Sequence, residues 1–269
     1  MLKKATILIT FLIAIVSQAQ TMESPYVCPP CDSTCDSKTF DKAGKCDVCH
    51  MDLITKEKRE RDIMETSKEK KKIAFYLQDG VEVLDFAGPM EVFVYAGYEI
   101  FTVSKTKEPI LSQGILKVIP DFSITDAPKS DILAFFGGNA DNAYRDREVI
   151  DWVKAQTDVE YYFSVCTGAF VLAEAGILEN QTATTFHEAL DGLENRYPNV
   201  NVKRDVRFVD NGTVITTAGV SAGIDGALHM VAKLQGLEKA KEVAFYMEYD
   251  KWEPGEGLIL TADNPYKNK

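Results

Sequence analysis

The sequence predicts an α/β fold, a flavodoxin-like sandwich with a mostly parallel sheet and helices on both faces, plus a small cysteine-rich head suited to metal binding. From Ile73 onward, short apolar runs alternate with helical segments, an order typical of parallel strands joined by crossover helices. The runs are mostly apolar rather than regularly alternating with polar residues, which indicates strands buried on both faces. Ahead of them, five of the six cysteines fall between Cys28 and Cys49, and this density predicts the separate head.

The strands and helices follow from these runs, which are rich in aromatic and β-branched residues. The expected strands are Ile73–Leu77, Tyr98–Val103, Ile132–Phe136, Tyr161–Val165 and Val214–Thr217. The expected helices are Pro89–Ala96, Arg147–Gln156, Thr167–Ala175, Ala222–Lys233 and Leu237–Tyr249. The alternating segment Gly114–Ile124 predicts a hairpin. We therefore place the large domain at residues 72–250 and a C-terminal tail at 251–269.

The first 19 residues have the pattern of a secretory signal peptide. Lys3 and Lys4 precede the apolar run Ala5–Val16, and Ser17-Gln18-Ala19 offers a cleavage site with small residues. The run is too short to span a bilayer, which needs about 20 apolar residues. We expect an exported protein, periplasmic or secreted, that leaves the membrane once the signal is cleaved. An uncleaved N-terminal anchor is the alternative.

The chain is acidic, with a formal net charge of −11. Nucleic acids and anionic membrane surfaces repel such a chain, so the charge argues against both as partners. The hydrophobic fraction of 45% is ordinary for a globular protein. A small-molecule substrate is the class of partner that remains.

Residues 26–53 form the cysteine-rich head. The pairs Cys28-x-x-Cys31 and Cys46-x-x-Cys49 can each place two thiolates around one ion, a spacing typical of a structural zinc site. Cys35 is then the spare thiol. Disulfides are the alternative, because an exported protein lies where thiols oxidise. The following segment, 54–71, is dense in mixed charge and predicts a solvated helix or an extended linker.

Cys166 stands alone in the large domain. An apolar strand runs into it, a helix starts directly behind it, and Gly168 relieves crowding in the turn. Ligands of parallel sheets bind at the carboxyl ends of strands, and a helix N-terminus favours a thiolate over a thiol. The arrangement predicts a nucleophile elbow built on cysteine. A small, inert cysteine at the end of a buried strand is the alternative.

Two neighbouring segments favour the functional interpretation of Cys166. Another apolar strand ends in Gly137-Gly138, whose backbone N–H groups can approach a ligand closely, as an oxyanion hole requires. Pro89 suits the first position of a helix, so we expect Asp85 just before that helix, at the end of the first strand. A carboxyl group near a thiolate would have a raised pKa and could transfer protons. A turn or capping aspartate is the alternative.

Five motifs, in the expected order over nearly all of Lys72–Tyr249, resemble the ThiJ/PfpI superfamily, which has the class I glutamine amidotransferase-like fold. Within it they are most similar to isonitrile hydratases and to the N-terminal domains of AraC-type regulators. The motifs are Leu84-Asp85-Phe86-Ala87-Gly88-Pro89-x-Glu91-Val92-Phe93, Gly137-Gly138, Ser164-Val165-Cys166-Thr167-Gly168-Ala169, Ala183-Thr184-Thr185 and Ala218-Gly219-Val220-Ser221-Ala222-Gly223-Ile224-Asp225.

This resemblance implies a role for each matched residue. Cys166 is implied as the nucleophile, Asp85 as the acidic partner that hydrogen-bonds near it, and Thr167 as a residue that orients or donates. The turn at Gly137 and the backbone N–H groups of Thr167 and Gly138 are implied to line an anion site. Family members are commonly homodimers, so a homodimer is implied as well.

The head resembles the small heavy-metal-binding domain of bacterial efflux proteins, through Tyr26-Val27-Cys28-Pro29 and through the run from Gly44 to Leu53. That family typically has Met-His where this chain has Pro30-Cys31. Four thiolates suit zinc or another soft metal, whereas His50 and Met51 as added ligands would suit copper. The identity of the metal stays open.

Together these features predict an isonitrile hydratase-like enzyme that hydrates or hydrolyses a small molecule and needs no cofactor for catalysis. Thr167 stands where protease-like members have a histidine, which argues against a Cys-His peptidase. Phe186 stands where hydratase-like sequences tend to have one, and His187 after it is more typical of a surface residue. We expect His229 to be structural. Glyoxalase- or deglycase-like chemistry, a non-catalytic role in metal handling or redox sensing, and an inactive fold remain alternatives.

Overall fold

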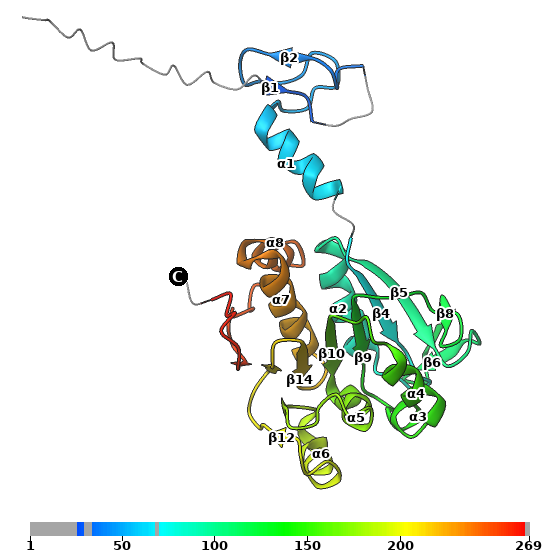
Figure 1. The fold of residues 1–269 in the computed structure, drawn as a ribbon. Helices are drawn as coiled ribbons and strands as arrows, with labels where there is room; N and C mark the ends of the chain where they lie inside the picture. Colours follow the sequence, from blue (N-terminus) through cyan, green and yellow to red (C-terminus); the bar gives the residue numbers. More distant parts are fainter. Residues whose placement is uncertain (1–25, 30–33, 68–69, 267–269) are drawn as a thin grey trace, which may run out of the picture. The chain divides into compact units, whose positions relative to one another are not determined.

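The computed structural model describes residues 26–29, 34–67 and 70–266, and the chain divides into two compact units, Met1–Glu69 and Lys70–Lys269 (Figure 1). The expected signal peptide, residues 1–19, lies outside the described residues. Within the described ranges, no helix is both long enough and apolar enough to cross a bilayer.

The first unit is a small sheet followed by a helix. Strand β1 (Tyr26–Val27) pairs antiparallel with β2 (Thr39–Phe40) and with β3 (Ile54–Thr55), and α1 (Lys56–Ser67) follows directly. Its core consists of three buried cysteines, Cys28, Cys35 and Cys46, with the partly buried Phe40, Cys49, Met51 and Leu53 packed against them. So small a core supplies little burial, and domains of this size are commonly held by metals or disulfides.

The second unit is built on a mostly parallel sheet, as the sequence predicted. Its strand order is β15-β13-β14-β10-β9-β4-β5-β8, and within it only the pair β13 and β14 runs antiparallel among the described residues. The strands are β4 (Lys72–Tyr76), β5 (Glu99–Ser104), β8 (Phe122–Ser123), β9 (Ile132–Phe135), β10 (Tyr161–Val165), β13 (Phe208–Asp210), β14 (Val214–Thr217) and β15 (Leu258–Ile259). Two small pairs form separate sheets, β6 (Ile110–Ser112) with β7 (Leu116–Val118), and β11 (Thr182–Ala183) with β12 (Asn201–Val202).

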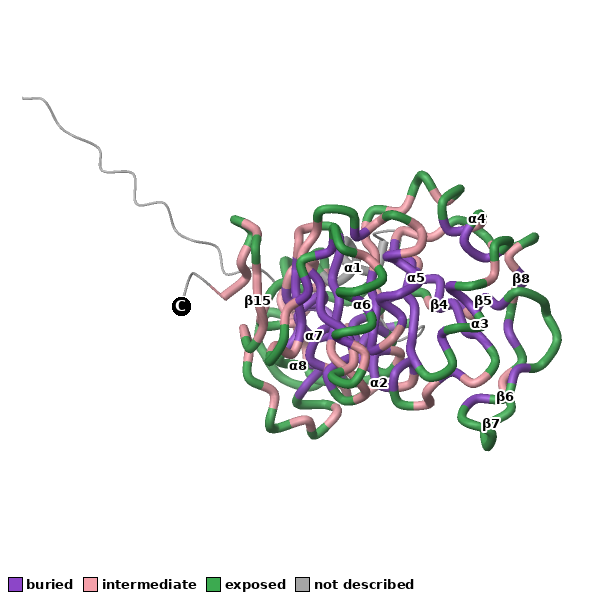
Figure 2. Tube along the Cα trace, turned by 90° about the horizontal axis from the view of Figure 1, so that it is seen from below, coloured by how far each residue is buried: buried purple, intermediate pink, exposed green. Residues whose placement is uncertain are grey.

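Helices cover both faces of this sheet (Figure 1). Side chains alternate between the faces along each strand. Ile73 and Phe75 of β4 therefore join one core, whereas Ala74 and Tyr76 join the other. Buried positions gather in the strands and along the inner sides of the helices (Figure 2). The first core includes α2 (Val83–Tyr95), α7 (Ala222–Gln235) and α8 (Leu237–Tyr246), and the second includes α3 (Asp141–Tyr144), α4 (Arg147–Ala155), α5 (Ala169–Glu174) and α6 (Leu190–Arg196).

Helix α2 begins earlier than the sequence predicted. We expected it to start at Pro89, with Asp85 in the preceding connection, but Asp85 lies in its first turn and Pro89 lies inside it. A Cβ on Gly88 would come within 2.8 Å of Ile224, and one on Gly223 within 3.2 Å of Pro89. Close packing of α2 against α7 thus stabilises a helix that proline alone would disfavour.

The C-terminal tail is part of the sheet unit. Strand β15 pairs in parallel with β13, and the Tyr266 hydroxyl lies 2.9 Å from Nδ1 of His229. The other ring nitrogen, Nε2, lies 2.9 Å from a carboxylate oxygen of the fully buried Asp210, which also accepts from Lys233. Because Nε2–H donates to the carboxylate, Nδ1 is left to accept from the tyrosine. His229 is therefore structural, as expected.

Candidate active site

Cys166 lies where β10 ends and a short 3-10 turn, Cys166–Gly168, leads into α5. Its φ of 58° lies in the left-handed region, which is uncommon for a residue other than glycine and characteristic of strained functional turns. A Cβ on Gly168 would come within 2.4 Å of the carbonyl oxygen of Phe135, so the turn requires glycine there. The backbone of Cys166 donates to Ala218 and accepts from the Thr185 hydroxyl at 2.7 Å, and these bonds hold the strained conformation.

Asp85 is fully buried beside this turn. Its two carboxylate oxygens accept hydrogen bonds from the backbone N–H groups of Gly137, at 2.8 Å, and Val220, at 3.1 Å. The Cys166 thiol lies beside this carboxyl group, close enough for each to affect the pKa of the other. Segments from three parts of the chain therefore fix one carboxyl group against one sulfur.

The glycine pair completes the site. A Cβ on Gly137 would lie 2.6 Å from the Cys166 sulfur and 2.7 Å from an Asp85 oxygen, so no other residue fits between them. Gly138, with φ of 81°, approaches Gly80 and pairs with Val81. Its N–H and the N–H of Thr167 lie close enough to the Cys166 sulfur to oppose the rise in the pKa of the thiol. The structure thus brings Cys166, Asp85 and both glycines together. Their roles in a reaction stay predictions.

The pKa values of both Asp85 and Cys166 are raised above their usual values. Burial raises the pKa of Asp85 to about 6, against the opposing hydrogen bonds from Gly137 and Cys166. Burial, then the charge of Asp85, raises the pKa of Cys166 to about 12, although the N–H groups of Thr167 and Gly138 act in the opposite direction. We expected the helix N-terminus to favour the thiolate. The short helix α5 does not offset the cost of burying a second negative charge beside a carboxylate.

Other residues singled out in the sequence have clear positions. The Thr167 hydroxyl donates to the carbonyl oxygen of Gly138 at 3.4 Å, so it can orient the glycine turn. The Phe186 ring packs on Gly219, where a Cβ would lie 2.5 Å from it. His187 is an exposed surface residue, its side chain 74% accessible.

Val220 is a site residue that the sequence analysis did not single out. Its φ of 51° is an outlier for a β-branched residue, and this backbone supplies the N–H that Asp85 accepts. The motif around Ala218–Gly223 was noted only as a resemblance. Nothing in residue type marks a valine as a backbone donor, so only the fold could reveal it.

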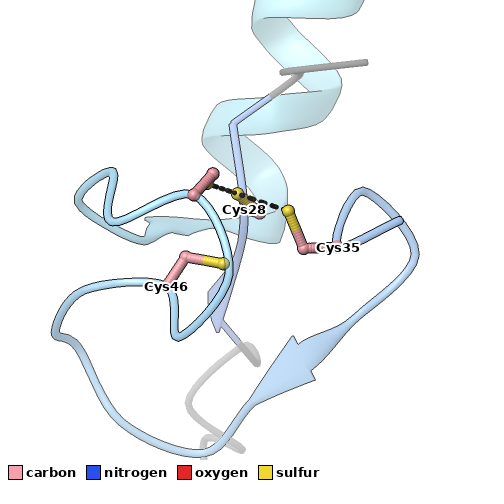
Figure 3. Close-up of side chains that lie close together, drawn as sticks. Cys28, Cys35 and Cys46 are labelled. Atoms are coloured by element: carbon pink, nitrogen blue, oxygen red, sulfur yellow. Dashed lines mark hydrogen bonds between the residues drawn. The ribbon is translucent and has the colours of Figure 1, made fainter. Parts of the chain in front are cut away.

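In the first unit, four cysteines form one cluster: Cys28, Cys35, Cys46 and Cys49, with all their sulfurs within 4.8 Å of one another. The Cys28 and Cys35 side chains point toward each other (Figure 3), with sulfurs 3.8 Å apart, and the Cys28 and Cys49 sulfurs are 3.1 Å apart. Four thiolates around zinc lie about 3.8 Å apart when each bond is about 2.3 Å, so the donor set fits a soft metal ion. Hydrogen bonding from Cys28, then from Met51, lowers the pKa of Cys49 to about 6.

The composition of this cluster differs from the set predicted by spacing. Cys35 was expected to be the spare thiol, whereas its sulfur lies within this group. Cys31, predicted as a ligand, lies outside the described residues. The spacing of the two Cys-x-x-Cys pairs gives no sign that the Cys35 sulfur lies beside those of Cys28, Cys46 and Cys49.

The second unit is thus an α/β protein with a cysteine on a strained strand-to-helix turn and a buried carboxyl partner. Residues 71–233 match the model of the DJ-1/PfpI family, and the chain belongs to this family. Residues 26–56 match the heavy metal binding domain. These matches confirm three predictions: the ThiJ/PfpI superfamily, the fold class, and the resemblance of the head to a heavy-metal-binding domain.

Named relatives differ in what they do. The chain is 33% identical to an isonitrile hydratase from Pseudomonas putida over 66% of this chain and 78% of the relative. It is 28% identical to the transcriptional regulator CdhR from Pseudomonas aeruginosa, of which it spans about half, 52%. Among solved structures, a ThiJ/PfpI family protein from Pseudomonas syringae superposes with a TM-score of 0.64 at 29% identity over 71% of this chain and 81% of the other. DJ-1beta from Drosophila melanogaster superposes with 0.61 at 23% identity, over 67% and 98%.

Proposed function

We propose that the second unit is a cysteine-dependent hydratase of small molecules. Its substrates are isonitriles or compounds with a similarly electrophilic carbon atom. The observation that carries the proposal is the contact of the Cys166 thiol with the Asp85 carboxyl group inside a ring of backbone N–H groups. A nucleophile and a proton carrier held within hydrogen-bond reach are the minimum apparatus for adding water through a covalent intermediate. The similarity to an isonitrile hydratase supports the choice of substrate class.

The proposed reaction has two halves. Sγ of Cys166 forms a bond to the terminal carbon of the isonitrile, while the thiol proton passes to the Asp85 carboxylate and from there to the same carbon. The product is a thioimidate. Water, deprotonated by Asp85, then adds to that carbon and the carbon–sulfur bond breaks. Asp85 gives the proton taken from water to the nitrogen, and the hydroxyl proton passes to the departing sulfur as the carbonyl group forms. An N-substituted formamide leaves, and the thiol is restored.

Raised pKa values suit these steps. Asp85 with a pKa near 6 is a base at neutral pH and becomes an acid readily once it holds the thiol proton. No imidazole competes for this task in the second unit, because His187 is exposed and His229 is bound to Asp210 and Tyr266. This supports proton transfer by the carboxyl group rather than by a Cys-His pair.

The rate should depend on the ionisation of Asp85. The active form holds an Asp85 carboxylate and a Cys166 thiol, so we expect kcat/KM to fall about tenfold per pH unit below pH 6 and to stay level from about pH 7 to 9. Initial rates of formamide production across that range would measure this. Asp85→Asn should remove most of the activity, and the activity that remains should no longer fall below pH 6. An unchanged rate at pH 4.5 would contradict the role of Asp85 as a base.

Export and assembly complete the proposal. The charge and apolar pattern of residues 1–19 supports secretion to the periplasm or beyond, and the family resemblance supports a homodimer. The same thiol and carboxyl pair is the second candidate apparatus, for glyoxalase-like chemistry on small carbonyls, because a thiol can add to a carbonyl carbon while the carboxyl group transfers the proton. A methylglyoxal assay beside the isonitrile assay distinguishes the two.

The head supports a metal-binding role, and structural zinc fits its four thiols best. Bound zinc would supply a closed cross-link between β1, the loop at Cys35 and the loop that carries Cys46 and Cys49. We expect the reduced full chain to bind a single zinc ion per chain, measured by metal analysis after gel filtration. Cys35→Ser should lose it, whereas Cys166→Ser should retain it. If Cys31→Ser releases zinc and Cys35→Ser does not, the spacing-based ligand set is the right one.

A further inference from the structure

Arg59 lies on α1, beyond the end of the segment that matches the heavy metal binding domain. Its guanidinium reaches back to the head, where Nη1 donates to the carbonyl oxygen of Asp36 at 2.5 Å. Asp36 directly follows Cys35 in the chain. Arg59 therefore fastens the loop that brings Cys35 into the cysteine cluster.

The Nε–H of Arg59 is a second, independent observation. It is buried, and among the described residues it has no hydrogen-bond acceptor. A buried charged donor without an acceptor is costly, and a bound ion or the atoms it orders can supply the missing partner. In a head built from thiols, the partner that a metal creates is a thiolate sulfur, which accepts hydrogen bonds and carries negative charge.

The negative charge of the metal-bound thiolates explains why a positively charged side chain such as Arg59 would lie near the cluster. Four thiolates carry four negative charges, and a divalent ion cancels two, so a loaded site keeps a net charge of about −2. Three of the four cysteines are buried, so water cannot screen that charge well. A neighbouring guanidinium can compensate one of the two remaining charges and keep the loop in place.

We infer that Arg59 is a positioning residue of the metal site, which holds the Cys35 loop and compensates the charge of the metal-bound thiolates, so the functional head extends into α1. The inference rests on the proposed metal binding by the four cysteines. It corrects the expectation that 54–71 is only a solvated helix or linker, since β3 and α1 pack on the head.

The test compares zinc affinity of the full chain and its variants by competition with a chromogenic chelator. We expect Arg59→Ala to weaken zinc binding roughly 10- to 100-fold, the usual effect of removing a residue that supports metal ligands. Arg59→Lys keeps the charge but not the forked geometry and should recover part of the loss. Arg61→Ala is the matched control, because Arg61 is an exposed arginine on the same helix.

Cobalt-loaded protein separates this role from simple loss of folding. A hydrogen bond or a positive charge beside thiolate sulfur moves the sulfur-to-cobalt charge-transfer band, so Arg59→Ala and Arg59→Lys should shift it while Arg61→Ala should not. If the wild type binds zinc and cobalt but Arg59→Ala matches Arg61→Ala in affinity and spectrum, the inference is wrong and metal binding stands. If the wild type binds neither metal, both the proposed metal binding and the role of Arg59 are wrong.

Discussion

Replacing Cys166 with alanine should lower turnover of isonitriles on the order of 10⁴-fold or more, because no other group in the site can form the covalent intermediate. The described residues around it supply backbone N–H groups, one carboxyl group and the hydroxyls of Thr167 and Thr185, none of which replaces a sulfur nucleophile. Formamide production, followed by its infrared amide band or by chromatography, measures the effect.

The variant should remain folded, since Cys166, a residue 6% exposed, contributes only a small side chain to a large core. Thermal unfolding of Cys166→Ala beside the wild type is the control. Equal turnover in both proteins would remove Cys166 from the mechanism. Loss of methylglyoxal turnover instead of isonitrile turnover would keep Cys166 and change the substrate.

Replacing Gly137 with alanine should damage both stability and activity. The new methyl group would lie 2.6 Å from the Cys166 sulfur and 2.7 Å from the Asp85 oxygen, and Asp85 is held by two backbone donors and cannot swing away. Overpacking of this kind costs about 1–3 kcal/mol, and a displacement of about 1 Å between reacting groups can cost about 100-fold in rate.

Gly192→Ala in α6 is a suitable control for this experiment. A Cβ at Gly192 would meet only the Phe170 ring, at an ordinary 3.7 Å. We expect that variant to unfold at the wild-type temperature or slightly above, because alanine favours a helix. Chemical unfolding and kcat/KM are compared for both variants. A Gly137→Ala enzyme with wild-type rate and stability would show that the sulfur and the carboxyl group are not held so closely.

Much of this fold could be predicted from local sequence. Apolar runs buried on both faces predicted β4, β5, β9, β10 and β14 to within about a residue or two at each end, since burial determines their composition. The start of α2 could not be predicted, because Pro89 inside it is compensated by contacts with α7, which lies more than 100 residues away in the chain. Very short strands such as β13 and β15 have no periodicity to detect.

In the candidate sites too, features with a local sequence signal could be predicted, and features that depend on distant segments could not. Cys166 and the glycine turns could be found, because strand ends and glycines leave local signals. The donor role of the Val220 backbone and the inclusion of Cys35 in the cluster could not, because each depends on where a distant loop returns. The direction of the Cys166 pKa shift was missed for a related reason, since it depends on burial and on the proximity of Asp85.

The tail that follows α8 has a consequence for solubility. Strand β15 covers the outer edge of β13, and the Tyr266 hydroxyl on His229 anchors the segment that follows it. An uncovered edge strand offers unpaired N–H and C=O groups on which another chain can add, which is a common start of aggregation. Proteolytic trimming behind α8 would therefore leave the cysteine turn intact and still produce a protein prone to associate through its exposed sheet edge.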